Sequence, residues 1–182
     1  MQTDRRGFIK GSIVAAIAAP NLILSGCRKD DLIDRDLQFN SMDQGYDEAV
    51  RLSRIELLVT DTAFSLPQTL IHCAQSIEFS MAGFPEPKSA LFQKTVGSVA
   101  FSVFSWRGRM SHDLSEAIPG AKALNPTVTV EQALQRLRNS IDAFRASESI
   151  LKPHFAYGTL TKNEYERAHA MHLADHFSAI NG

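Results

Sequence analysis

Residues 130–151 read VEQALQRLRNSIDAFRASESIL and form the strongest helical pattern in the chain. The apolar side chains that recur at the helical period are Val130, Leu134, Leu137, Ile141 and Phe144. Polar groups, Arg136, Arg138 and Asp142, occupy outer positions between them, as expected for a helix with one buried face. Thr129, directly before the pattern, is a suitable N-cap. The stretch therefore predicts an amphipathic helix that needs other helices to cover its apolar side.

Three other segments predict helices of the same kind. They run from about Met42 to Thr60, from about Pro67 to Met81, and from about Thr161 toward the end of the chain. The last begins with Thr161-Lys-Asn-Glu164, which has the form of a capping box. Its inward stripe is expected to comprise Tyr165, Ala168, His172, Ala179 and Ile180. No pair of segments predicts a β-hairpin, so the expected fold is all-α, an antiparallel helical bundle.

A long section between the second and third main helices, residues 83–130, is interrupted by prolines and glycines. Inside it, Leu91 to Trp106 is strongly apolar and fits two patterns. The length of the segment favours a helix, whereas its β-branched residues and Gly97 leave a strand open. We expect this section to be an excursion from the bundle.

The first 27 residues predict export. Arg5 and Arg6, followed by Phe8 and Lys10, are typical of a twin-arginine signal, although Asp4 replaces the usual Ser or Thr and leaves general export open. Leu24-Ser-Gly-Cys27 has the form of a lipobox, in which the cysteine is lipidated. An amphipathic N-terminal helix of the folded domain is the alternative.

The expected organisation is a signal peptide over residues 1–27, a charged tether over 28–40 and a helical domain over 41–182. The protein would be periplasmic and lipid-anchored. Arg28 is not the aspartate associated with inner-membrane retention, which favours the outer membrane.

Composition narrows the functional classes. The formal net charge of −1 gives no electrostatic footprint for nucleic acid. Of the two cysteines, Cys27 is the expected lipidation site, so Cys73 has no partner for an internal disulfide. Six histidines are present, and His169, His172 and His176 lie close together near the end of the chain.

The spacing of His172 and His176 suggests metal chemistry. Residues four apart on a helix lie on one face, so both imidazoles can reach one ion. His72 on the second predicted helix is the natural third ligand from a facing helix. The alternative for His72 is a core histidine hydrogen-bonded to a carbonyl or carboxylate.

Several motifs together resemble the DinB-like, or YfiT-like, superfamily, and within it a branch known only as a domain of unknown function. The motifs are Thr69-Leu-Ile-His-Cys-Ala-Gln-Ser-Ile-Glu-Phe-Ser80, Gly83-Phe-Pro-Glu-Pro-Lys88, Arg107-Gly-Arg-Met-Ser-His112, Ile118-Pro-Gly-Ala121 and His172-Leu-Ala-Asp-His176. The resemblance covers the chain from about residue 40 onward. It implies an up-down-down-up four-helix bundle with a divalent metal ion, zinc or nickel, held by His72, His172 and His176.

The resemblance also implies an activity class, since better understood members of the superfamily are thiol-dependent transferases or hydrolases. Family members often have a Gln after the last ligand, at the position of Ala179 here. The loss of that Gln puts an orienting contact in doubt. We expect His169, Asp175 and His112 to support the ligands, with His112 on a loop that could cover the ion, and His154 to lie at the surface.

The sequence is compatible with three functions. The chain could be a metal-dependent hydrolase or transferase, a metal- or ligand-binding lipoprotein without turnover, or a bundle whose apolar middle section docks a partner at the membrane. The expected partners are a small molecule and, through the lipid, a membrane; a homodimer is compatible with the sequence, and nucleic acid is not expected.

Overall fold

A computed structural model of the protein describes residues 34–60 and 62–182. The described part is mostly helical, as the sequence predicts. It contains five helices of ten or more residues: α1 (Met42–Leu52), α2 (Leu66–Ala82), α4 (Ser98–Arg107), α5 (Val130–Ala146) and α6 (Lys162–Ser178). The shorter elements are α3 (Ala90–Phe92), a π-helical turn (Gln93–Gly97), β1 (Val59–Thr60) and β2 (Ile180–Asn181). The predicted signal peptide with Arg5, Arg6 and Cys27 lies outside the described residues, as does the first part of the predicted tether.

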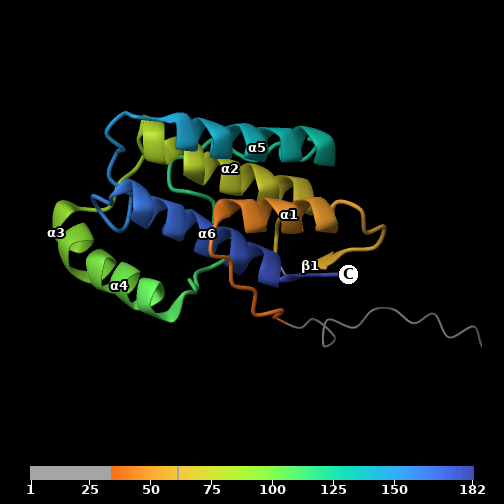
Figure 1. Ribbon diagram of the computed structural model, residues 1–182, viewed down its shortest axis with the longest axis horizontal. Helices are drawn as coiled ribbons and strands as arrows, with labels where there is room; N and C mark the ends of the chain where they lie inside the picture. The colour runs from red at the N-terminus through yellow and green to blue at the C-terminus, as the bar shows by residue number, and fades with distance from the viewer. Residues whose placement is uncertain (1–33, 61) are drawn as a thin grey trace, which may run out of the picture.

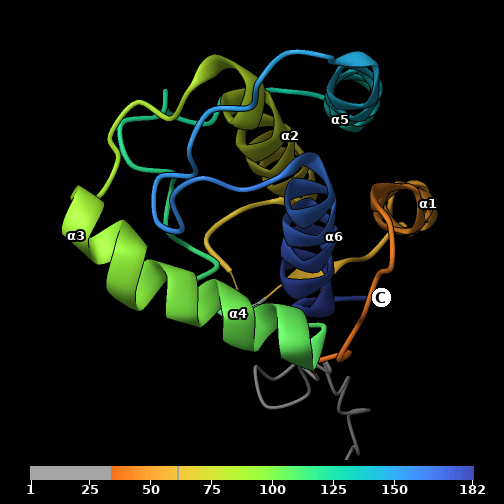
Figure 2. The same cartoon turned by 60° about the vertical axis from the view of Figure 1, so that its left-hand side comes forward.

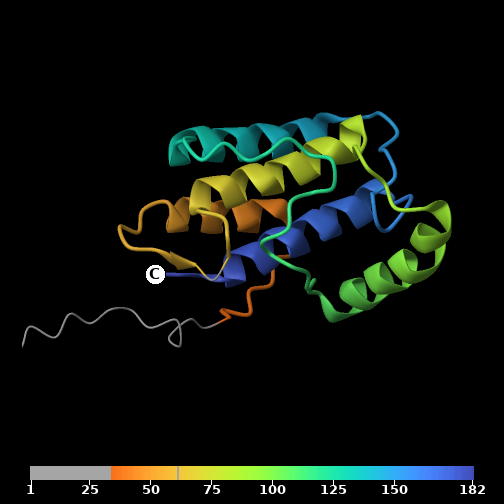
Figure 3. The ribbon, with the colours of Figure 1, turned by 180° about the vertical axis from the view of Figure 1, so that it is seen from behind.

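The helices α1, α2, α5 and α6 pack against one another (Figures 1 and 3). Helix α2 packs against α5 and α6, and α1 packs against the same two helices. The segment between α2 and α5 leaves this group of helices and carries α3 and α4 along one side of the molecule (Figure 2). The predicted excursion is therefore present.

The core between the four helices is formed largely by the predicted apolar faces, and it also contains Phe177, which lies outside the stripe predicted for the last helix. Its largest fully buried side chains include Leu70 of α2, Leu137 and Phe144 of α5, and Tyr165 and Phe177 of α6. Burial of a side chain of this size contributes about 1.5–3 kcal/mol, so these contacts dominate the stability of the fold.

Two predicted helix starts are confirmed in detail. The Thr129 side chain accepts the backbone N–H of Gln132 at 3.2 Å, and the Gln132 side chain accepts the backbone N–H of Thr129 at 3.1 Å. Thr161 and Glu164 form the same reciprocal pair at the start of α6. Each pair satisfies two backbone donors that a helix start leaves free.

Several predicted boundaries are wrong. Helix α1 ends at Leu52 rather than near Thr60, because short turn hydrogen bonds from Arg54 and Ile55 close its last turn. Val59–Thr60 then pairs with Ile180–Asn181 as a two-stranded antiparallel sheet. Consequently Ile180, expected on the last helix, lies in β2, and α6 ends at Ser178. Pairing between segments so far apart in the chain cannot be recognised from a local sequence pattern.

The apolar segment Leu91–Trp106 is helical, with a π-helical turn at Gln93–Gly97. Gly97 is required here by space: a Cβ at this position would lie 1.9 Å from the backbone oxygen of Ala156. Gly97 weakens the helical pattern in the sequence, but in the structure it allows this helix to lie close to the segment that precedes α6. No helix within residues 34–60 and 62–182 is long and apolar enough to cross a membrane.

Candidate metal centre

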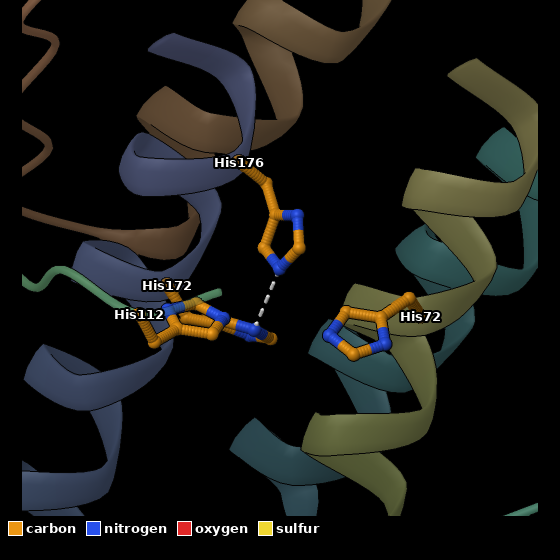
Figure 4. Close-up of side chains that lie close together, drawn as sticks. All are labelled: His72, His112, His172 and His176. Atoms are coloured by element: carbon orange, nitrogen blue, oxygen red, sulfur yellow. Dashed lines mark hydrogen bonds between the residues drawn. The ribbon is translucent and has the colours of Figure 1, made fainter. Parts of the chain in front are cut away.

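Helices α2 and α6 bring three histidine rings together (Figure 4). The ring centroid of His72 lies 5.1 Å from that of His172 and 4.7 Å from that of His176. His172 and His176 lie one turn apart on α6, with their Nε2 atoms 3.1 Å from each other. All three side chains point into the space between the two helices. The three residues selected from the sequence are therefore neighbours in the structure.

A fourth histidine, His112, lies in the same cluster. It comes from the chain after α4, and its ring centroid is 5.2 Å from that of His172 and 5.1 Å from that of His176. One ring nitrogen from each of the four residues lies within 4.8 Å of the others. The four histidines are thus close enough to hold one metal ion. The sequence suggested only a supporting role for His112, because loop residues have no periodicity that indicates where they point.

The carboxylate of Asp175 lies beside the ring of His112. Its Oδ2 lies 2.7 Å from His112 Nδ1, and its side chain is mostly buried. The two atoms are at ion-pair distance without hydrogen-bond geometry, since Oδ2 accepts no hydrogen bond from the described residues. A carboxylate at this distance still favours a proton on Nδ1 and leaves the other nitrogen to accept a cation. Because Nδ1 faces Asp175, Nε2 is the nitrogen that His112 can offer. Asp175 therefore supports a neighbouring group, although it is one residue away from the ligand-bearing face of α6.

Burial keeps the three helical histidines neutral. Loss of hydration lowers the pKa of His72 to about 4, with a smaller contribution from His112. Burial also holds the pKa values of His172 and His176 well below the usual range for histidine, and the neighbouring imidazoles lower them further. Neutral imidazole is the form that binds a metal ion, so the protonation state suits this role at neutral pH.

Two of the ring nitrogens that face away from the cluster have no partner. Nδ1 of His72 and Nδ1 of His176 are buried without a hydrogen-bond partner among the described residues. The His72 ring is instead held by packing against Phe64, at a centroid distance of 5.6 Å. A cation held between the rings would bind the nitrogens that face one another, such as Nε2 of His172 and of His176, so these Nδ1 atoms would keep their unpaired state.

A cavity of about 250 Å³ opens beside the cluster, close to the lower end of the range of about 300–1,000 Å³ for small-molecule sites. His72, His112 and His172 form part of its wall. The other polar or aromatic lining residues include Lys88, Glu116, Phe155, Tyr157 and His169. The cavity wall thus contains one cationic side chain, Lys88, and one anionic side chain, Glu116, besides the histidines of the cluster.

His169 lies outside the cluster. Its ring is buried between Tyr165 and Phe144, at centroid distances of 5.4 and 5.5 Å. Burial lowers its pKa to about 3. His169 is a lining residue of the cavity, and it is not among the four rings that converge.

The surface position predicted for His154 is wrong. The residue is buried, its ring stacks on Tyr157 at 4.2 Å, and its Nδ1 accepts the backbone N–H groups of Ala156 and Tyr157. The neighbouring Pro153 suggests a surface position, and nothing in the local sequence indicates that this segment folds back onto α6. Cys73 is buried and free, as expected, and burial raises its pKa. Ala179, which follows α6, supplies no polar side chain to the site.

These features define a mostly helical protein with a four-histidine cluster beside a cavity of about 250 Å³. Residues 32–181 match the family described as "Protein of unknown function (DUF1569)". The match covers most of the chain, and the protein belongs to this family. Comparison with curated proteins and with solved structures gave no match.

Proposed function

We propose that the protein is a metal-dependent enzyme of the DinB-like type, with a four-helix bundle formed by α1, α2, α5 and α6. In this proposal His72, His172 and His176 hold a divalent cation, zinc or nickel. The observation that supports it best is the convergence of three buried, neutral imidazoles from two helices. The motif resemblance along the chain is an independent argument for the same three residues.

A cation bound by neutral imidazoles keeps its full charge and supplies Lewis acidity at the cavity wall. The chain's own groups would then have distinct tasks. The three helical histidines hold the cation in a site largely shielded from water, and Asp175 orients His112 toward the same point. Lys88 and Glu116 lie where they can bind polar groups of a substrate.

The reaction class that we propose is hydrolysis of a small molecule, with thiol-dependent transfer as the second form. The cavity of about 250 Å³ suits a small substrate. The choice of hydrolysis follows from the proposed location, because low-molecular-weight thiols are scarcer outside the cytoplasm. The location itself rests on the arginine pair and the Leu24-Ser-Gly-Cys27 motif, which together favour an exported, lipid-anchored protein.

A non-catalytic metal-binding lipoprotein is the alternative, and His112 is the observation in its favour. Four histidine ligands would complete a tetrahedral site, and closed sites of this kind are usually structural. The burial of the four residues differs, however. His112 is 32% exposed and comes from a loop, whereas the other three are buried on helices. His112 is therefore the residue of the four that a substrate in the cavity would meet at the exposed side of the cluster.

Metal content is the test of this proposal. The protein is purified after export by its native route, and its metal content per chain is compared with that of His172→Ala. His154→Asn serves as the matched control, because His154 is also a buried histidine but lies outside the cluster. We expect one cation per chain in the wild type and in the control, and loss of most of it in His172→Ala.

Two results bear on the choice between the functions. Unchanged metal content in a folded His172→Ala variant would refute the proposed site, with circular dichroism confirming the fold. Unfolding measured with and without a chelator separates the catalytic site from a structural one. A structural ion should stabilise the fold strongly, whereas an open site should be emptied with modest destabilisation.

A further inference from the structure

The segment formed by α3, the π-helical turn and α4 has an apolar face that no described residue covers. Leu91 is 75% exposed, Val99 63% and Trp106 86%. The exposed apolar side chains of this segment are Leu91, Phe92, Val96, Val99, Val103 and Trp106. From Phe92 onward their spacing alternates between four and three residues, so they form one continuous stripe along the helix. We call these six residues the outer stripe.

The opposite face of the same helix is well packed. Phe101 is buried against Tyr157, with ring centroids 5.5 Å apart, and Phe104 contacts the same ring at 6.4 Å. Gly97 is buried against the backbone of Ala156. The helix is therefore fixed by its inner face, and the outer stripe is a second apolar surface directed away from the molecule.

Polar groups around the outer stripe suit an apolar environment. The hydroxyl groups of Thr95, Ser98 and Ser102 donate to backbone oxygens one turn earlier, at 2.7–3.0 Å. Because these donors already have partners within the helix, bringing them near apolar matter costs less than for free hydroxyls.

The charges of this segment are all positive. Residues 89–107 contain Lys94 and Arg107 and no Asp or Glu, although the whole chain has slightly more acidic than basic residues. An apolar face with flanking cations and an exposed tryptophan is typical of helices that lie in the interface of a phospholipid bilayer. The cations would face the phosphate groups of the lipids.

The place where the described chain begins also favours contact between the outer stripe and a membrane. Arg109, three residues after Trp106, contacts the carboxylates of Asp34 and Asp36, so the described chain begins beside the carboxyl end of α4 (Figure 2). Cys27 precedes Asp34 by seven residues. A chain of this length spans at most about 25 Å. A lipid on Cys27 would thus hold the Trp106 end of the outer stripe close to the membrane.

We propose that the outer stripe docks onto the bilayer that holds the lipid of Cys27, with Trp106 among the lipid headgroups. The inference rests on the lipid anchor of the proposed function and does not depend on the metal site. The helix lies along the membrane surface, and the tether supplies the high local concentration that one short apolar face needs for stable binding.

Trp106 is the only tryptophan of the chain, so its fluorescence reports on the outer stripe directly. Lipidated protein, with the lipid on Cys27 verified by mass spectrometry, is reconstituted into vesicles of phosphatidylethanolamine and phosphatidylglycerol. We expect Trp106 emission to shift to shorter wavelength relative to protein in buffer, and brominated acyl chains to quench it. Val99→Ser combined with Val103→Ser should restore the long-wavelength emission. The matched control is Leu57→Ser with Ile150→Ser, two side chains that are 70% and 91% exposed elsewhere, and it should behave like the wild type.

The outcomes distinguish failure of the docking from failure of the anchor. Protein that carries the lipid and floats with the vesicles, but whose Trp106 emission is unshifted and unquenched, would overturn the proposal and leave the anchor intact. Absence of lipid on Cys27 would overturn both. Short-wavelength emission without vesicles, together with a doubled mass in sedimentation equilibrium, would assign the outer stripe to a second copy of the chain instead.

Discussion

Replacing the buried His154 by Asn should make the protein less sensitive to mild acid. Desolvation lowers the pKa of His154 to about 3, whereas histidine in an unfolded chain titrates near 6.5. Between these values the unfolded state binds a proton that the folded state does not, so stability falls as the pH is lowered below about 6.5. The slope for one such residue is about 1.4 kcal/mol per pH unit.

Between pH 7.5 and pH 5.5, His154 should account for a loss of about 1.4 kcal/mol in the free energy of unfolding. An Asn side chain can place its Oδ1 where Nδ1 of His154 accepts the backbone N–H groups of Ala156 and Tyr157. It cannot replace the stacking on Tyr157, so the variant should also be less stable by an amount that does not depend on pH. The pH-independent loss cancels when the free energy of unfolding at one pH is subtracted from that at the other, so this difference isolates the titration of His154.

The assay is urea denaturation of wild type and His154→Asn at both pH values, each with a chelator present. His154 lies outside the four-histidine cluster, so the other buried histidines contribute equally to both proteins and cancel in the comparison. The wild type should lose about 1.4 kcal/mol more than the variant on acidification. Equal losses would mean that His154 is accessible to protons in the folded state, and the assignment of this residue to the core would be refuted.

Three further perturbations test other parts of the structure. Gly97→Ala would place a Cβ 1.9 Å from the Ala156 oxygen, and should lower the unfolding free energy in urea by about 1–3 kcal/mol; an unchanged value would contradict the close approach. Asp175→Asn removes the charge that orients His112 and should weaken zinc binding about tenfold or more in a chelator competition; equal affinity would separate the carboxylate from the site. Cys73 is buried and its pKa is raised, so iodoacetamide should label it only as fast as the chain unfolds; rapid labelling of the native protein would disprove its burial.

The helical elements could be predicted because their signals are local. The apolar period of residues 130–144 and the capping residues Thr129 and Thr161 act over one or two turns, and the structure follows them. The end of α1 and the pairing of β1 with β2 could not be predicted in this way. Residues 59–60 adopt a strand because residues 180–181 lie beside them, which is a consequence of the tertiary fold.

The same distinction holds for the candidate site. His172 and His176 are related by one helical turn, which can be read from their spacing. His72 could be selected because a facing helix was expected to supply a third ligand and because the motif resemblance implies a histidine at this position. His112 and His154 depend on how loops fold back onto α6, and nothing in their immediate sequence indicates it. The cavity beside the cluster is likewise a product of loop packing.

The proposed site requires imidazoles from α2 and α6 to share one cation. X-ray absorption spectroscopy of the zinc-loaded protein measures this most directly, because it reports the number and kind of ligands. We expect at least three imidazole nitrogens at about 2.0–2.1 Å and no sulfur. A spectrum with fewer than three imidazoles, or with a sulfur ligand at about 2.3 Å, would contradict it.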